Sequence, residues 1–152
     1  MPKNTVVNDL ISLVQLDIDA IHAYEQAIER VTVDSVRTQL NVFKADHHRH
    51  VTDLSTEIRK LGGTPPTFSK DFKGYLIQGF TALRSVTGTE GALKAMETNE
   101  KLTNSTYEKA VTWNIPVEVR QIVQRNLEDE RRHLSYIRQA IEKKVWATKE
   151  AA

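Results

Sequence analysis

The sequence of 152 residues contains no cysteine. This absence excludes disulfide bonds, zinc fingers, iron–sulfur clusters and a thiol nucleophile. It is also compatible with a reducing cytosol, so we expect a cytoplasmic protein. Glycine and proline are few, at six and four residues, and with 39% hydrophobic and 27% charged residues the composition is that of a soluble globular protein.

Neither sign of charge is in excess, since 21 basic and 20 acidic residues give a net charge of +1. This balance gives no general attraction to nucleic acid or to an anionic membrane, so we expect neither as a partner. The segment Met1 to Asp9 lacks the apolar core of a signal peptide, and no apolar run approaches the ~20 residues of a membrane span. The length predicts one domain over residues 1–152.

What the sequence does contain is a helical pattern of apolar residues, spaced alternately by three and four positions. The pattern predicts an all-α protein with four long helices, over roughly residues 8–32, 35–61, 90–113 and 116–145. Gly62 and Gly63, followed by two prolines, end the second helix, and Pro116 suits the first turn of the fourth. Because the connections within each pair are short, we expect two antiparallel helical hairpins.

The hairpins are joined by a long crossover, from Gly62 to Gly88, which is too long for a simple turn. Its middle has an apolar stripe at helical spacing, formed by Phe72, Leu76, Phe80 and Leu83. We predict a short extra helix there, packed on the bundle. The alternative is that these side chains are partly exposed and form a partner surface. The sequence leaves open whether the third helix runs parallel or antiparallel to the first.

The most informative feature is an internal repeat. Residues 10–58 and 93–141 align without gaps at an offset of 83 positions, which places Asp17 on Glu100, His47 on Glu130 and His50 on His133. Each half therefore has one acidic residue followed, 30 and 33 positions later, by a pair of metal-ligand type at spacing i, i+3. This spacing puts both members of a pair on the same helical face.

All six of these residues lie on the predicted buried stripes, near the middle of their helices. Charged side chains are rarely buried without partners, because the loss of water costs several kcal/mol per ion. A divalent cation compensates for that loss, and carboxylate and imidazole ligands suit iron, manganese and zinc. A salt-bridged network that fixes the helix register is the alternative. Asp46 and His48 flank the ligand positions but point off the stripe, so we expect both on a solvated face.

The pattern resembles the ferritin-like superfamily of four-helix carboxylate proteins, which includes rubrerythrins and bacterioferritins. The resemblance implies one acid from each of two helices, here Asp17 and Glu100, and a Glu-x-x-His pair from each of the other two. Glu130 and His133 match that pair, and His50 matches the other histidine. The chain is also similar to a set of uncharacterised ferritin-like bundle proteins of about this length, through Leu61-Gly62-Gly63, Gln78-Gly79-Phe80, the segment from Glu97-x-x-Glu100 to Tyr107, and Pro116 onward.

The chain departs from the superfamily pattern at His47, where the resemblance implies a glutamate that bridges two metals. We expect one metal to bind Asp17, His47 and His50, and the other to bind Glu100 and His133, with Glu130 as the bridge. Only three carboxylates then offset the charge of two ions, and Glu97, three residues before Glu100, is an additional candidate ligand.

Three functions fit this sequence. The first is a non-haem oxidoreductase with two iron ions that reacts with dioxygen or peroxide, as a peroxidase or ferroxidase, and takes electrons from an external donor. The second is a non-catalytic, stress-associated or structural bundle that holds zinc or manganese, or a single metal ion. The third is a metal-free interaction module. Assembly into a homo-oligomer is compatible with each.

Overall fold

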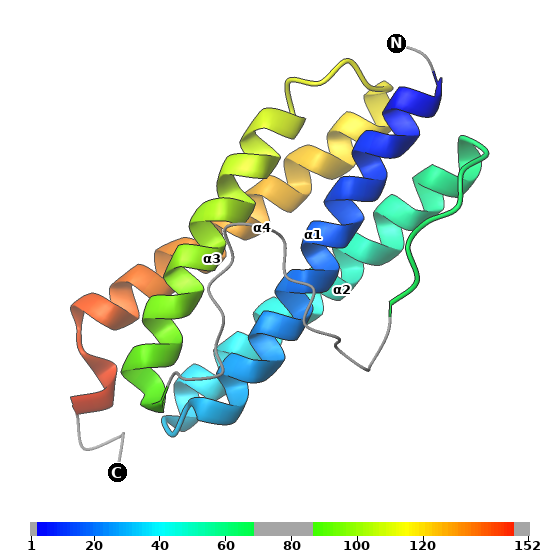
Figure 1. Cartoon of the computed structure of the whole chain (residues 1–152). Helices are drawn as coiled ribbons and strands as arrows, with labels where there is room; N and C mark the ends of the chain where they lie inside the picture. Colours follow the sequence, from blue (N-terminus) through cyan, green and yellow to red (C-terminus); the bar gives the residue numbers. More distant parts are fainter. Residues whose placement is uncertain (1–2, 69–86, 148–152) are drawn as a thin grey trace.

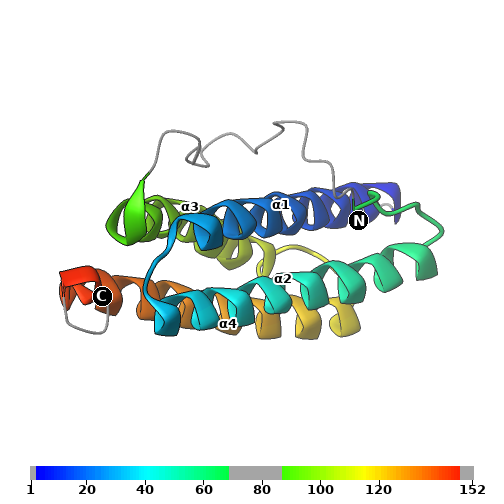
Figure 2. The same cartoon turned by 90° about the horizontal axis from the view of Figure 1, so that it is seen from below.

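The structure is a computed structural model, and it describes residues 3–68 and 87–147. Four long helices span Lys3–Arg30 (α1), Asp34–Lys60 (α2), Gly88–Ala110 (α3) and Val117–Glu142 (α4), and a short 3-10 helix follows at Val145–Ala147 (η1). The four helices form a bundle of two layers, with α1 beside α3 in one layer and α2 beside α4 in the other (Figures 1 and 2). The predicted four-helix bundle is confirmed, and α1 begins several residues earlier than the apolar stripe indicated.

The direction of the hairpins, which the sequence left open, is settled by contacts between α1 and α3. The backbone N–H of Thr32, just after α1, donates to the Thr89 hydroxyl in the first turn of α3 at 2.9 Å. At the middle of the bundle, the Tyr107 hydroxyl of α3 donates to Asp17 of α1. The end of α1 therefore lies beside the beginning of α3, and the two helices run antiparallel (Figure 1).

The long crossover is confirmed by its two ends, because α2 ends and α3 begins at opposite ends of the bundle (Figure 1). Gly62 ends α2 with a left-handed φ of 85°. Its N–H bonds to the carbonyl of Arg59 at 3.0 Å, and the N–H of Gly63 bonds to the carbonyl of Ile58 at 2.9 Å. This pair of bonds is the Schellman motif that a C-terminal glycine favours. The predicted extra helix, with Phe72, Leu76, Phe80 and Leu83, lies outside the described residues.

Two apolar clusters fill the interior at the two ends of the bundle and leave a polar slice between them. One cluster includes Tyr24, Phe43, Leu93 and Ile137; the other includes Leu10, Leu54, Tyr107 and Val123. On α2, for example, the buried residues include Phe43, His47, His50 and Leu54, in this order along the helix. The predicted ligands therefore lie in the middle of the core, away from both ends of the bundle.

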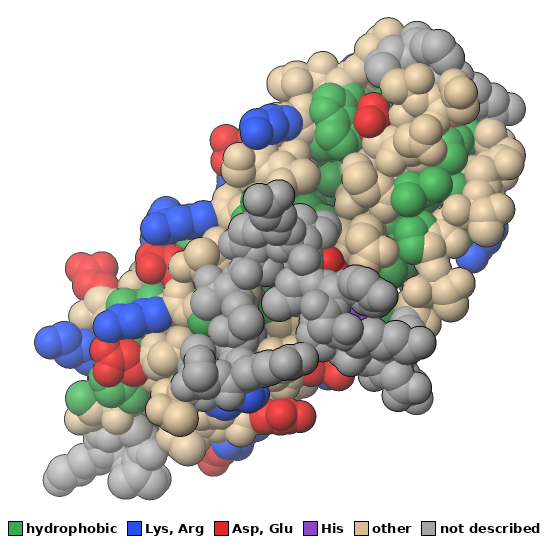
Figure 3. All heavy atoms as spheres, viewed as in Figure 1, with side chains coloured by type: hydrophobic (Ala, Val, Ile, Leu, Met, Phe, Trp, Pro, Cys, Tyr) green, Lys and Arg blue, Asp and Glu red, His purple; other side chains and the backbone are tan. Residues whose placement is uncertain are grey.

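On the face drawn in Figure 3, acidic and basic side chains are interspersed over the described residues, and hydrophobic side chains form narrow areas between polar ones. In the described ranges, no helix combines the length and the apolarity that a membrane crossing needs.

Candidate metal centre

The structure brings together the six residues aligned by the internal repeat. The side chains come from all four helices, and none is more than 1% exposed. Their ligand-type atoms form two groups, within each of which one atom per residue lies within 4.8 Å of the others. Asp17, His47, His50 and Glu130 make the first group, and His47, Glu100, Glu130 and His133 make the second.

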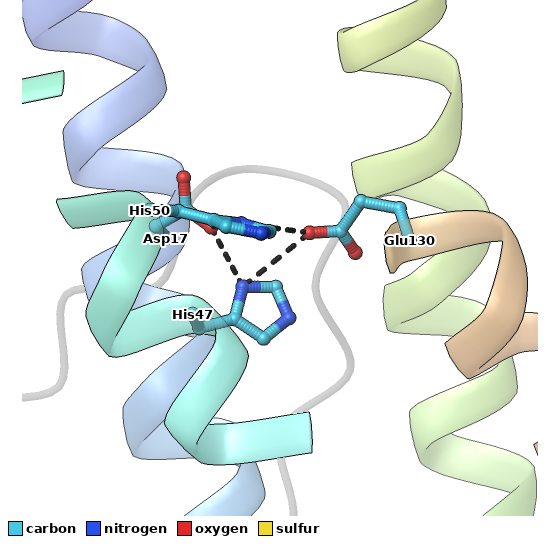
Figure 4. Close-up of side chains that lie close together, drawn as sticks. All are labelled: Asp17, His47, His50 and Glu130. Carbon is cyan, nitrogen blue, oxygen red and sulfur yellow. Dashed lines mark hydrogen bonds and ion pairs between the residues drawn. The ribbon is translucent and has the colours of Figure 1, made fainter. Parts of the chain in front are cut away.

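The first group is arranged around one carboxylate oxygen of Asp17. Oδ1 of Asp17 lies 2.6 Å from Nδ1 of His47 and 3.0 Å from Nδ1 of His50. Oε1 of Glu130 approaches the same two nitrogens at 3.4 and 3.5 Å. Figure 4 shows the four side chains converging in this way from α1, α2 and α4. Two nitrogens and two oxygens thus face a common centre.

The second group is its counterpart across the bundle. Nδ1 of His133 lies 2.8 Å from Oε2 of Glu100 and 3.6 Å from Oε2 of Glu130. Nε2 of His47 approaches Oε1 of Glu100 at 3.8 Å. Again two imidazoles and two carboxylates meet, and every one of them is buried.

His47 and Glu130 belong to both groups, with a different atom directed to each. Glu130 turns Oε1 toward the first group and Oε2 toward His133. His47 turns Nδ1 toward Asp17 and Nε2 toward Glu100. Because His47 and Glu130 each give one atom to each group, both groups offer four donors. The sequence analysis had expected His47 to bind only one of the two metals.

Glu97, the additional candidate ligand, is not brought into either group. Its side chain is 28% exposed, and its carboxylate lies 3.4 Å from the guanidinium of Arg138 on α4. The ion pair with Arg138 holds Glu97 on the outside of the α3–α4 face, although its spacing of three residues from Glu100 suits a second ligand.

Asp46 and Asp129 contact two histidines of the centre from its outer side, although the sequence analysis placed Asp46 on a solvated face and passed over Asp129. Nε2 of His50 on α2 donates to Asp129 of α4 at 2.9 Å, and Nε2 of His133 on α4 donates to Asp46 of α2 at 2.8 Å. The expectation of a solvated Asp46 is therefore wrong, because its side chain is only 13% exposed and faces His133. His48 is exposed, as expected.

When His50 and His133 are neutral, as metal binding requires, these outer hydrogen bonds fix the tautomer of both rings. A proton held on Nε2 leaves Nδ1, which faces the centre, free to bind a metal. Two arginines keep the aspartates charged: Arg49 pairs with Asp129, and Arg132 lies 2.7 Å from Asp46 and 3.1 Å from Asp129. Burial alone would raise the pKa of Asp129, but His50 and Arg49 hold that pKa well below its usual range.

We predict that Asp46→Asn and Asp129→Asn each lower metal affinity by roughly 10–100-fold, because the histidine that each aspartate orients loses its fixed tautomer. Asp53→Asn is the matched control, since Asp53 also pairs with an arginine across α2 and α4, Arg125 at 2.6 Å, but touches no histidine of the centre. Competitive metal titration measures the effect. Equal affinities in all three variants would contradict the role of the two aspartates.

Hydroxyl groups orient the carboxylates of the centre. The Tyr107 hydroxyl donates to Oδ2 of Asp17 at 2.5 Å, which leaves Oδ1 for the histidines. Asn126 donates to the Tyr107 oxygen at 3.3 Å. The Thr103 hydroxyl lies 2.6 Å from Oε1 of Glu100 and 2.9 Å from Oε2 of Glu130, so it can donate its one hydrogen to either carboxylate.

The electrostatics of the metal-free centre favour charged histidines. Burial opposes the charge of His47, but Glu130, Asp17 and Glu100 outweigh it and raise the pKa of His47 from 6.5 to about 10. Against the effect of burial, Asp17 and Asp129 raise the pKa of His50, and Glu100 and Asp46 raise the pKa of His133. Conversely, burial and the nearby charge of Glu100 raise the pKa of Glu130.

A pH dependence of stability follows from His47. Its proton stabilises the folded, metal-free protein fully below the unfolded pKa of about 6.5, and this stabilisation, on the order of a few kcal/mol, is lost as the pH rises through about 10. We therefore expect the free energy of unfolding, measured in urea with a chelator present, to fall between pH 6.5 and 10. His47→Gln gives a shallower fall. A free energy that rises over this range would contradict the assignment.

The donor set fits a pair of divalent cations. Among the described residues, Nε2 of His47 and Oε1 of Glu130 are buried without a hydrogen-bond partner. Buried polar atoms in native proteins are almost always paired, so these two atoms need a partner such as a metal ion. Imidazole nitrogen and carboxylate oxygen are ligands that suit iron, zinc and manganese.

Similar folds are known among proteins with metal pairs. The bacterioferritin of Desulfovibrio desulfuricans, whose diiron site is known in different catalytic states, superposes with a TM-score of 0.76 at 20% identity, over 98% of this chain and 86% of that chain. A ferritin-like diiron-carboxylate protein from Bacillus anthracis str. Ames superposes with a TM-score of 0.72 at 17% identity, over 93% and 99% of the respective chains. No curated protein sequence is significantly similar to this chain.

The fold is thus that of a ferritin-like four-helix bundle protein, as the sequence predicted. Within that class, the chain belongs to the DUF2383 family, a domain of unknown function, whose model matches residues 5–112. The matched range contains nearly all of α1 and the whole of α2 and α3, but it ends before α4. The placement of Glu130 and His133 therefore rests on the structure of this chain.

Proposed function

We propose that this protein binds two metal ions in the polar slice of its core and reacts with dioxygen or peroxide as a non-haem di-iron oxidoreductase. The observation that carries this proposal is the pair of buried four-donor groups that share His47 and Glu130. Three carboxylates and three imidazoles in the middle of an apolar core are costly without cations. The resemblance in fold to diiron-carboxylate proteins supports iron as the metal.

Five of the six side chains would have a defined part in such a centre. Asp17 and His50 would hold one ion, Glu100 and His133 the other, and Glu130 would contact both. Bound iron would supply electrons to dioxygen or peroxide. The burial of all six ligands excludes bulk water, so a reactive species is protected from side reactions. Because the chain has no cysteine for an iron–sulfur or rubredoxin-type centre, electrons for repeated turnover come from an external donor.

We infer that Tyr24 donates a hydrogen bond to a small ligand of the centre. Its hydroxyl is buried and has no partner among the described residues. Its ring lies 5.5 Å from the ring of His47 and 6.2 Å from that of His133. Burial and the charges of Glu100 and Glu130 raise its pKa well above 10, so the hydroxyl keeps its proton at neutral pH.

Anaerobic loading with Fe²⁺ followed by exposure to dioxygen or peroxide tests the proposal. We expect uptake of two irons per chain, consumption of the oxidant and a new absorption band of oxidised iron. Tyr24→Phe leaves iron uptake unchanged and slows the reaction. Two bound irons that stay reduced in the presence of both oxidants would contradict the oxidoreductase function.

The second candidate is a bundle that holds zinc and does not catalyse redox chemistry. It is favoured by the three imidazoles of the centre, because zinc prefers nitrogen-rich sets of four donors and each group offers four. In that case the native protein contains zinc, and peroxide is not consumed. Assembly into a homo-oligomer remains a prediction under both functions.

A further inference from the structure

His47 differs from the other two histidines of the centre in having both ring nitrogens directed inward. Nδ1 lies 2.6 Å from Oδ1 of Asp17 in the first group, and Nε2 lies 3.8 Å from Oε1 of Glu100 in the second. The ring is fully buried. In Figure 4 the second nitrogen of His47 lies on the far side of the ring from Asp17 and His50. Each nitrogen therefore faces a different metal-binding group.

His50 and His133 instead direct one nitrogen inward and one outward. Their Nε2 atoms donate to Asp129 and Asp46, so each of these rings has a place for its proton outside the centre. His47 has no such outer acceptor, and its Nε2 has no hydrogen-bond partner in the part of the chain that the structure describes. With an ion in each group, a proton on either nitrogen of His47 would point at a cation.

The charge of the centre also favours a His47 ring without a proton. Two divalent ions bring four positive charges, and Asp17, Glu100 and Glu130 supply three negative ones. A net positive charge in a fully buried site is unfavourable. One further negative charge from His47 would make the centre neutral, as the glutamate that the superfamily pattern implies at this position would.

We propose that His47 bridges the two metal ions as an imidazolate, with Nδ1 bound to one ion and Nε2 to the other. This proposal rests on the two-metal centre proposed above. When the second ion binds, the remaining N–H bond of the ring breaks, the proton passes to solvent, and its electron pair forms the second metal–nitrogen bond. No electron is transferred. His47 thus replaces the absent carboxylate both as a bridge and as a charge.

Nuclear magnetic resonance of the zinc-loaded protein tests the bridge directly, because zinc is diamagnetic and binds imidazole nitrogen. The full chain is labelled with ¹⁵N-histidine and titrated with zinc, and the His47 signals are identified by their loss in His47→Gln and by their contacts with the Tyr24 ring, 5.5 Å away. At two zinc ions per chain, we expect both nitrogens of His47 to lack a proton. His50 and His133 each keep one N–H, and they serve as internal controls.

Substitutions supply an independent readout. His47→Gln takes a donor from each group, so we expect both zinc affinities to fall at least about tenfold, whereas Asp17→Asn weakens only one of them. His47→Glu restores a bridging anion and keeps two zinc ions per chain. Two bound zinc ions with a protonated nitrogen on His47 would overturn the bridge alone. Fewer than two zinc ions per chain would overturn both the bridge and the two-metal centre.

Discussion

Glu130→Gln is expected to abolish the binding of the second metal ion and to lower the affinity for the first. The loss of affinity should exceed the roughly 10–100-fold that follows from the loss of an outer hydrogen-bond partner. Glu130 is the only carboxylate that belongs to both described groups, and its two oxygens face different partners. Glutamine keeps the size of the side chain but offers one weak oxygen donor and no charge. Metal content after dialysis against metal-free buffer measures the effect.

The same substitution separates metal binding from folding. Because burial and Glu100 raise the pKa of Glu130, its charged form is unfavourable in the metal-free protein, and a neutral glutamine should unfold at an equal or higher urea concentration. Glu128→Gln, at an exposed position of α4, is the control and leaves both properties unchanged. A Glu130→Gln protein that retains two ions per chain would contradict the shared role of Glu130.

Metal loading is expected to raise the thermal midpoint of the protein strongly. Free metal at about 1,000 times its Kd stabilises the folded state by about 4 kcal/mol. For a chain of this length, that corresponds to roughly 8–16 °C. The ions offset the repulsion between the carboxylates of Glu100 and Glu130. They also supply a partner to buried atoms that have no hydrogen bond, His47 Nε2 and Glu130 Oε1.

This thermal shift should grow with pH. Protons compete with metal for the three histidines, whose pKa values are raised by the carboxylates around them, so metal binding releases protons and strengthens as the pH rises. Calorimetric unfolding with and without metal at pH 6 and pH 8 checks this. His48→Gln is the control, because His48 is exposed on the outside of α2. A shift that is larger at pH 6 than at pH 8 would be inconsistent with histidine ligands.

The sequence predicted the position of the six residues because helical periodicity and a fixed offset between two halves are properties of the chain alone. It did not predict the ring orientation of His47, since periodicity assigns a residue to a helical face but does not direct its two nitrogens. Glu97 was a candidate because of its spacing of three residues from Glu100, and the cation of Arg138 keeps it outside the centre. The direction of α3 relative to α1 depends on contacts such as that of Thr32 with Thr89, between residues far apart in the sequence.

Asp46 and Asp129 show a signal that was present in the sequence but was interpreted wrongly for Asp46 and overlooked for Asp129. They are aligned by the same offset of 83 positions as the candidate ligands, and each directly precedes one of them. A residue next to a buried position normally faces outward on an isolated helix. In the bundle, however, it faces the neighbouring helix, where each aspartate meets a histidine of the other hairpin. The regular pairing of an acid with the following ligand in both halves was the sign of this role.

The metal content of native protein, purified without chelators or an affinity tag, tests the central claim most directly. The measurement is made beside the double variant Glu130→Ala, His133→Ala, whose helix content is checked by circular dichroism. We predict two metal ions per chain in the native protein and the loss of at least one of them in the folded variant. Native protein without bound metal, or a variant that retains both ions, would contradict the metal centre.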